Sequence, residues 1–127
     1  MGKKVLSLGQ CAFDHGALGR FFLRHFQAEL IPADKPDEAL DLFSSGFFDL
    51  VLVNRILDRD QSSGLDFIKV FLLKRLGKTP VMLISNLPEA QAQAMGLGAV
   101  PGFGKAELES PAAIRLAGNI LAGHAPG

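Results

Sequence analysis

Polar or flexible residues stand at, or just after, the ends of the apolar runs in this 127-residue sequence. These residues are Gly9, Gln10, Asn54, Ser85 and Lys105. A hydroxyl group, an ammonium group and the backbone around a glycine can together bind a small anion. An amide does different chemistry, because its nitrogen lone pair is delocalised into the carbonyl and its neutral oxygen holds a cation only weakly. The set is therefore typical either of a small anion-binding cup or of ordinary polar residues at strand ends.

The motifs of common enzyme sites do not occur in the sequence. A cysteine-dependent phosphate loop at Cys11 needs an arginine six positions later, where Ala17 stands. His15 could activate the Cys11 thiol, but a structural cysteine and a surface histidine are the simpler interpretation. The glycine patterns of nucleotide-binding loops do not occur, and one cysteine with three dispersed histidines forms no metal-binding pattern. We therefore expect no enzyme activity, no metal ion and no cofactor.

The composition predicts one compact globular domain. Apolar residues make up 48% of the chain and charged residues 20%, which is too apolar for a disordered segment. Thirteen basic and thirteen acidic residues cancel, so neither nucleic acid nor an anionic membrane is expected as a partner. No apolar stretch approaches the roughly 20 residues of a membrane helix, and a single cysteine is typical of a reducing compartment. We expect a cytoplasmic domain over residues 1–122, followed by a tail over residues 123–127.

Alternating strand and helix patterns separate these polar residues. Strands are predicted over residues 3–8, 28–33, 49–54, 79–85 and 99–103. Helices are predicted over residues 13–26, 36–46, 64–77, 87–98 and 111–121, with Ser63, Asn86 and Ser110 as the expected caps of the last three. Such alternation implies parallel βαβ units with right-handed crossovers. The predicted fold is α/β, a doubly wound five-stranded parallel sheet whose strand ends meet at one ligand-binding edge.

Four stretches of the sequence carry a resemblance to a known family. They are KKVLSLGQCAFDHGAL, ALDLFSSGFFDLVLVN, TPVMLIS and GAVPGFGK. In order and spacing they resemble the CheY-like receiver domains of bacterial two-component response regulators, and the resemblance covers nearly the whole chain. It implies the (βα)5 receiver sandwich, which is flavodoxin-like, and a role in signal transduction. It also implies a pocket made of an acidic pair, a phosphorylated aspartate, a hydroxyl residue and a lysine.

Only part of the family's pocket pattern is present when its positions are matched to this sequence residue by residue. Ser85 falls on the hydroxyl position and Lys105 on the lysine position. The acidic pair falls on Gly9 and Gln10, and the phosphoacceptor position falls on Asn54. Phosphorylation of a receiver needs a carboxylate nucleophile and Mg²⁺, which prefers carboxylate oxygen ligands. We therefore expect no phosphorylation at Asn54 and no magnesium site beside it.

The segments around the pocket also depart from the family pattern. Between Asn54 and Gly64 the chain is about two residues longer than usual and lacks the usual proline. Lys105 is followed by Ala106 rather than by the proline usual in the family, so no cis peptide bond is expected there. Three acids near the pocket could substitute for the missing ones, but solvated acids are the favoured interpretation. They are Asp14 at the start of the first helix, and Asp58 and Asp60 in the longer loop.

Without this chemistry, the sequence favours an atypical receiver-like module, a pseudo-receiver, that acts through protein contacts. Receivers signal largely through the face made by the fourth helix, the fifth strand and the last helix. Here residues 87–104 include one charged residue, Glu89, and the last helix has more apolar residues than one buried stripe needs. A homodimer or a partner helix would fit this face, whereas a broad buried stripe is the structural alternative. The candidate contact residues are Gly102, Phe103, Leu116 and Ile120, of which Gly102 stands at the family's aromatic switch position.

Two further possibilities stay open. The third helix, DFIKVFLLKRL, is apolar around much of its circumference and is a competing contact face. A small-anion or small-ligand-sensing domain of the same fold is the alternative function, with Lys105, Ser85 and the backbone around Gly9 forming the cup. We expect no attached output domain for DNA binding or catalysis, and the identity of the protein partner is not predicted.

Overall fold

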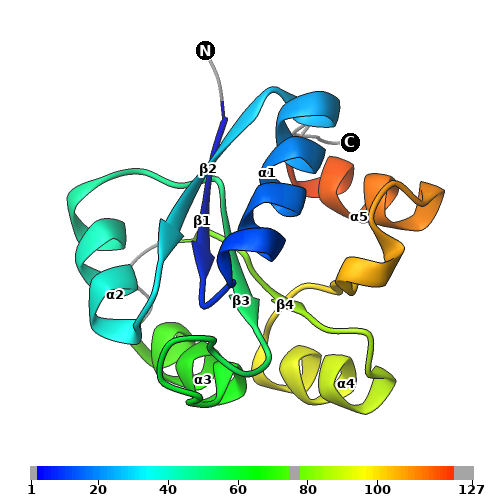
Figure 1. The fold of residues 1–127 in the computed structure, drawn as a ribbon. Coiled ribbons are helices and arrows are strands. Elements are labelled where there is room, and N and C mark those ends of the chain that lie inside the picture. The colour runs from blue at the N-terminus through cyan, green and yellow to red at the C-terminus, as the bar shows by residue number, and fades with distance from the viewer. Residues whose placement is uncertain (1–2, 75–77, 122–127) are drawn as a thin grey trace.

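The structure is a computed structural model that describes residues 3–74 and 78–121. The elements in chain order are β1 (Lys3–Leu8), α1 (Ala12–Phe26), β2 (Ala28–Ala33), α2 (Pro36–Ser45), β3 (Leu50–Asn54), α3 (Gly64–Lys74), β4 (Val81–Ile84), α4 (Pro88–Leu97), the short 3₁₀ helix η1 (Lys105–Glu107) and α5 (Pro111–Leu121) (Figure 1). The predicted helix end at Gly77 and the predicted tail lie outside the described residues. Among the helices described, none is both long and apolar enough to cross a membrane.

The strands form one parallel sheet in the order β2-β1-β3-β4. Residues 5–8 of β1 and residues 50–53 of β3 are buried on both faces of the sheet, which explains their nearly continuous apolar sequence. Leu8 of β1 lies opposite Val53 of β3 in the register of the two strands. The residues that follow β1 and the last residue of β3 therefore meet at the same edge, as the sequence predicts.

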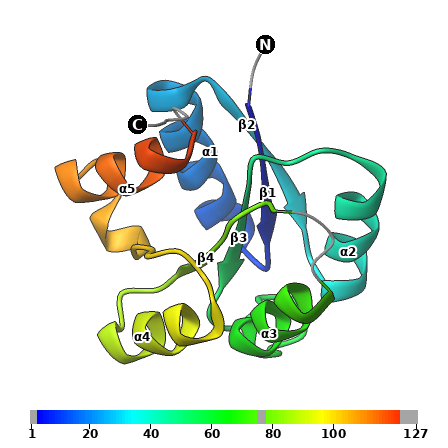
Figure 2. The same ribbon diagram turned by 180° about the vertical axis from the view of Figure 1, so that it is seen from behind.

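Helices cover both faces of the sheet, which confirms the doubly wound α/β arrangement (Figures 1 and 2). On one face α1 and α5 pack onto the sheet through a core layer that includes Phe21 and Phe22. On the other face α2, α3 and α4 form a second layer, to which α3 contributes Phe67 and Phe71. The edge that carries the polar residues is thus held in place from both sides.

Two of the three predicted helix caps are confirmed. Ser63 Oγ accepts a hydrogen bond of 3.3 Å from Asp66 N at the start of α3. Ser110 Oγ accepts one of 3.1 Å from Ala113 N at the start of α5. In both helices a serine side chain satisfies an N–H group that has no partner inside the helix.

The predicted cap of α4 is wrong. Leu87, rather than Asn86, is the residue that precedes the first turn of α4, and Pro88 begins the helix. The Asn86 side chain instead packs against Gly104, where a Cβ atom would overlap Asn86 Oδ1. The Asn86 side chain therefore contacts a distant segment of the chain, although the local sequence pattern predicts that it caps α4.

The predicted fifth strand is not formed in the described residues. Residues 99–103 run along β4 but make only one isolated bridge to it, at Val100. Pro101 has no N–H group to donate, and Gly102 N donates to the side chain of Gln91 at 3.1 Å instead of to a neighbouring strand. The sheet accordingly has four strands, not five.

Candidate functional site

The Asn54 side chain at the end of β3 is bonded to the main chain on all sides. Its Nδ2 donates hydrogen bonds to Gly9 O at 3.1 Å and to Ile56 O at 2.9 Å. Its Oδ1 accepts one from Arg55 N at 3.1 Å. A carboxylate at this position has no hydrogen to donate and would face both carbonyl oxygens. The amide therefore helps to join the loop after β1 to the loop after β3.

Leu57 fills the space beside the first position of the expected acidic pair. Gly9 has a φ of +83°, and a Cβ atom added to it would overlap Leu57 Cδ2. The Leu57 side chain is fully buried. A carboxylate at position 9 would have to displace this side chain, and the position also disfavours residues other than glycine. The space that a side chain at position 9 would enter is here occupied by hydrocarbon.

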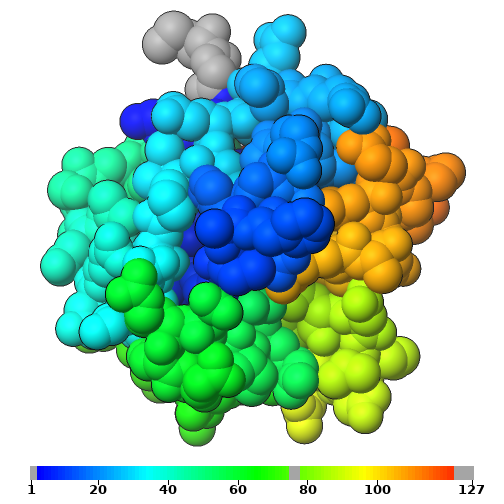
Figure 3. Space-filling view, in the orientation of Figure 1, coloured from blue at the N-terminus to red at the C-terminus, as the bar shows by residue number. Residues whose placement is uncertain are grey.

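The loop over residues 55–63 delivers Leu57 to this position. It folds back on itself through a hydrogen bond of 2.9 Å from Leu57 N to Ser62 O, and Asp58 N donates to Gly9 O at 3.0 Å. In Figure 3 the green region that includes this loop borders the blue start of α1. The extra length noted in the sequence is therefore used to close the loop onto the end of β1.

Two of the three nearby acids are solvated, as expected. Asp58 and Asp60 are both exposed. Hydrogen bonds from the hydroxyl and the amide of Ser62, at 2.6 and 3.0 Å, hold the pKa of Asp60 below its ordinary value. Both contacts lie within the loop, so Asp60 stabilises the turn and does not reach the pocket.

Asp14 departs from that expectation and lies in the site. Its Oδ2 atom accepts a hydrogen bond of 2.8 Å from Lys105 Nζ, and each side chain is only about one quarter exposed, at 26% and 27%. Burial raises the pKa of Asp14, but hydrogen bonds from Lys105 and Cys11 and the charge of Lys105 outweigh it and hold the pKa below 3.8. The prediction of a solvated Asp14 is wrong, because the fold brings Lys105 to the first turn of α1.

A cavity of about 360 Å³ opens at this edge of the sheet. Its lining residues are Asn54, Arg55, Ile56, Ile84, Ser85, Asn86, Leu87 and Lys105. Ser85 Oγ accepts a hydrogen bond of 3.1 Å from Leu87 N, which leaves its hydroxyl hydrogen available to a ligand. The structure thus brings Asn54, Ser85 and Lys105 together, with Gly9 bonded to Asn54.

Gln10 is placed differently from the rest of the predicted set. It is only 8% exposed and does not line the cavity. Neither atom of its side-chain amide has a hydrogen-bond partner within residues 3–74 and 78–121. The second position of the expected acidic pair therefore holds a buried neutral group, where an ionised carboxylate would be strongly disfavoured.

The predicted interaction residues differ in their exposure. Phe103 is 2% exposed and packs against Phe21, with 5.8 Å between the ring centroids. Leu116 and Ile120 are half-buried and pack against the core on the α1 side of the sheet. Gly102 is half-buried beside β4. The exposed apolar side chains of this region come from α4 and the residue before it, and are Leu87, Met95 and Leu97.

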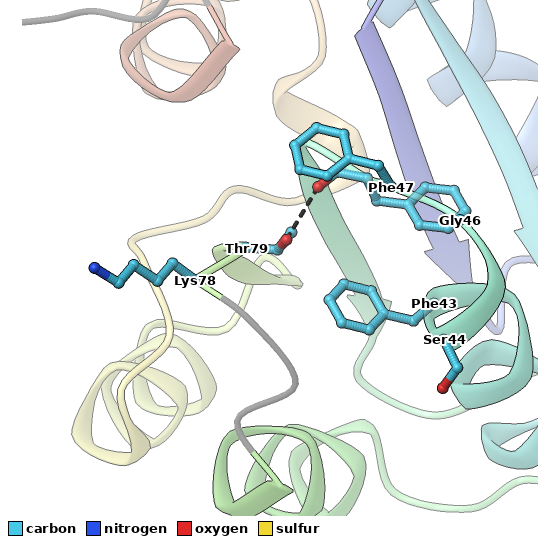
Figure 4. Close-up of a pocket in the computed structure, with 7 residues that line it drawn as sticks. Phe43, Ser44, Gly46, Phe47, Lys78 and Thr79 are labelled. Carbon is cyan, nitrogen blue, oxygen red and sulfur yellow. Dashed lines mark hydrogen bonds between the residues drawn. The ribbon is translucent and has the colours of Figure 1, made fainter.

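A second cavity, of about 430 Å³, lies at the opposite edge of the sheet. Figure 4 shows the side chains that line it, where Thr79 Oγ1 donates a hydrogen bond of 3.0 Å to Phe48 O. Its lining residues are Phe43, Ser44, Gly46, Phe47, Phe48, Lys78 and Thr79. These residues precede β3 and β4, so this cavity is separate from the strand ends that carry Asn54 and Ser85.

The comparison with known proteins identifies the fold. No family model and no curated protein matches the sequence. Among 228 solved chains that match, NtrX from Brucella abortus has a TM-score of 0.78 at 20% identity over 96% of this chain, which spans 28% of NtrX. The receiver domain of the DNA-binding response regulator merR from Colwellia psychrerythraea has a TM-score of 0.76 at 18% identity, over 95% of this chain and 99% of its own.

A third solved structure has the same fold. A response regulator from Burkholderia pseudomallei, solved with a phosphorylated aspartic acid, a calcium ion and citrate, has a TM-score of 0.69 at 22% identity. The similarity covers 94% of this chain and 66% of that one. The fold of this chain is therefore that of response-regulator receiver domains, which confirms the resemblance seen in the sequence.

Proposed function

We propose that this chain is a receiver-like signalling module that works without aspartyl phosphorylation, through contacts with another protein. One observation carries the proposal: the residue at the end of β3 is an amide that bonds to Gly9 O across the sheet edge and to Ile56 O and Arg55 N within its own loop. A nucleophile for phosphoryl transfer must present a free oxygen lone pair to the phosphorus. Asn54 has no carboxylate, and its amide is used for structure.

The residues present do not fit the divalent cation that receiver phosphorylation requires. Mg²⁺ seeks oxygen ligands in near-octahedral geometry, usually with one or two carboxylates. Position 9 has no side chain and is covered by Leu57, and Gln10 is a buried amide. In the described part of the chain, no group of three or more acids, histidines or cysteines is placed to hold a metal ion.

A phosphorylation assay tests the first half of the proposal. The protein is incubated with acetyl phosphate and Mg²⁺, and its intact mass is measured under conditions that preserve acyl phosphates. The mass should stay unchanged, while a phosphorylatable receiver in a parallel reaction gains one phosphoryl group. A labile phosphate mapped to Asn54 or a neighbouring residue would refute the proposal.

The surface of α4 supports the second half of the proposal, which is contact with a protein. Glu89 is the single charged residue of α4, and Met95 and Leu97 are 47% and 39% exposed. A surface with few charges and exposed apolar side chains loses little hydration when a partner covers it. The proposed partner is a second copy of the chain or another signalling protein in the cytoplasm, and not nucleic acid or a membrane.

An exposed substitution on α4 tests this contact face. Leu116 is half-buried, so an acid there would disturb the core, whereas Met95→Asp changes only the surface. Light scattering over a range of concentrations should show a dimer that Met95→Asp weakens, or affinity capture should recover a partner that the variant loses. Gln93→Asp on the same helix is the matched control. Self-association and partner binding that are both unaffected by Met95→Asp would exclude this face.

Small-anion sensing is the second candidate function, and the 360 Å³ cavity favours it. Arg55, Lys105 and the Ser85 hydroxyl all face that cavity, and none of its lining residues is acidic. The pairing of Lys105 with Asp14 reduces the attraction for an external anion. Saturable changes in the amide NMR signals of Ser85 and Lys105 on adding sulfate or phosphate to the unmodified protein would favour this function over the first.

A further inference from the structure

The edge of β4 is only partly covered by the chain that follows α4. Val100 N donates to Val81 O at 2.9 Å, and Ser85 N donates to Phe103 O at 3.1 Å. Between these two bonds the passing chain supplies no main-chain donor to the carbonyl of Leu83. A buried carbonyl without a donor destabilises a fold, so this part of the edge needs another partner.

Gln91 of α4 supplies that partner. Its Nε2 donates to Leu83 O at 2.9 Å and to Ser85 O at 3.1 Å, and its Oε1 accepts from Gly102 N at 3.1 Å. Both hydrogens of the side-chain amide are used, and its oxygen is used as well. A primary amide thus replaces one peptide unit of the missing fifth strand, because it donates to the sheet and accepts from the passing chain.

The geometry at Gly102 makes this arrangement specific. A Cβ atom on Gly102 would overlap Leu83 O and lie 2.8 Å from Met82 Cγ, so only glycine lets the chain approach β4 this closely. The chemistry at position 91 is equally restricted. An ionised glutamate has the same shape as Gln91 but cannot donate to either carbonyl, and its charge would face both of them.

Little else attaches α4 to the molecule. Its buried residues are Ala90 and Ala94, whereas α3 buries Phe67, Ile68 and Phe71. A buried phenylalanine or isoleucine side chain stabilises a fold considerably more than a buried alanine methyl group does. The three hydrogen bonds of Gln91 are therefore a large part of what holds α4 on the sheet.

We propose that Gln91 positions the α4 unit, defined as α4 together with residues 98–102, and that this unit detaches while the sheet and the buried Phe103 stay in place. Gln91 makes three of the bonds that dock the unit, because it is bonded to β4 and to Gly102 at the same time, and the bond from Val100 N to Val81 O is a fourth. Elements with little buried apolar area are those that open locally. This inference does not depend on the proposed function, although the α4 surface is the contact face proposed there.

Native-state hydrogen exchange at low denaturant concentrations tests the proposal. In the unmodified protein, the amides of α4 and Gly102 should exchange through a local opening. The free energy of this opening should depend on denaturant concentration less than half as steeply as that for residues 5–8 and 50–53. In Gln91→Ala the α4 unit should exchange roughly ten times faster or more, because hydrogen bonds worth about 0.5–1.5 kcal/mol each are lost. Gln93→Ala, on the same helix, should leave these rates unchanged.

A second variant keeps the test informative if Gln91→Ala folds poorly. Gln91→Glu preserves the side-chain volume and should accelerate exchange in the same residues, with Gln93→Glu as its control. NMR signals of the α4 unit should shift or broaden in Gln91→Glu while those of β1 and β3 stay in place. Equal denaturant dependence for α4 and the central strands, or equal effects of substitutions at positions 91 and 93, would overturn the proposal.

Discussion

Lys105 Nζ lies 2.8 Å from Asp14 Oδ2, although the two residues are 91 positions apart in the chain. The ion pair joins the first turn of α1 to η1, at the edge of the sheet where the cavity opens. The cation available to an anionic ligand therefore already has a carboxylate partner within the molecule. Removing that partner should change what the cavity binds.

Asp14→Asn is expected to convert the cavity into an anion site. Lys105 keeps its charge and loses its counterion, while Arg55 and Ser85 still line the cavity. Titration with sulfate or inorganic phosphate should shift the amide NMR signals of Ser85 and Lys105 in a saturable way in the variant, and much less in the unmodified protein. Asp41→Asn, an exposed acid of α2, is the control. Equal affinity in the unmodified protein and in Asp14→Asn would contradict this prediction.

The same ion pair should make stability depend on pH in the acid range. The folded pKa of Asp14 lies below its ordinary value of 3.8, so the folded state binds fewer protons than the unfolded state as the pH falls through this range. The stabilisation is therefore present above pH 3.8 and lost as the pH falls through the folded pKa. The free energy of unfolding of the unmodified protein minus that of Asp14→Asn should be constant between about pH 5 and 7 and decrease below. A difference that grows on acidification would have the wrong sign.

Asn54→Asp should destabilise the protein and should not restore phosphorylation. The carboxylate would face Gly9 O and Ile56 O, which now accept hydrogen bonds from the amide. Gly9 O would keep its hydrogen bond from Asp58 N, so the expected loss in urea unfolding is about 0.5–1.5 kcal/mol for each of the two hydrogen bonds lost. Asn119→Asp on the exposed side of α5 should change stability by less than about 0.5 kcal/mol. A variant as stable as the unmodified protein would show that the amide is not needed.

A carboxylate at position 9 should be tolerated better when Leu57 is made smaller. Leu57→Ala alone should cost about 2–5 kcal/mol, because a fully buried side chain is lost. Gly9→Asp alone should also destabilise, because of the overlap with Leu57 Cδ2 and the positive φ. In the double variant the loss should be smaller than the sum by about 1 kcal/mol or more, measured by urea unfolding. Strict additivity would show that the two side chains do not compete for one space.

The sequence predicts most of the architecture, because hydrophobic periodicity is a local property. All five helices and four of the five strands lie close to the predicted ranges. The fifth strand was predicted from the apolar residues of segment 99–103, and this pattern does not distinguish a strand from an extended segment along an edge. Gln91 decides between a strand and an extended segment, because its side-chain oxygen accepts the hydrogen bond from Gly102 N. The two residues are 11 positions apart in the chain, so the local pattern does not reveal this contact.

The site is predicted less completely, because its decisive contacts join distant segments. Alignment of the strand ends correctly groups Asn54, Ser85 and Lys105. The extra length of the loop after β3 is visible in the sequence. The sequence does not reveal that Leu57 of this loop turns inward and covers Gly9. Asp14 is equally inconspicuous, since an acid in the first turn of a helix is common and its partner is known only once the fold is built.

The Gln91 amide also bears on the solubility of the molecule. An open sheet edge offers unpaired N–H and C=O groups to strands of other molecules and so promotes aggregation. Gln91 occupies the carbonyl groups of Leu83 and Ser85, and residues 99–103 run alongside the rest of β4. The β4 edge of the sheet is thereby shielded from edge-to-edge association without a fifth strand.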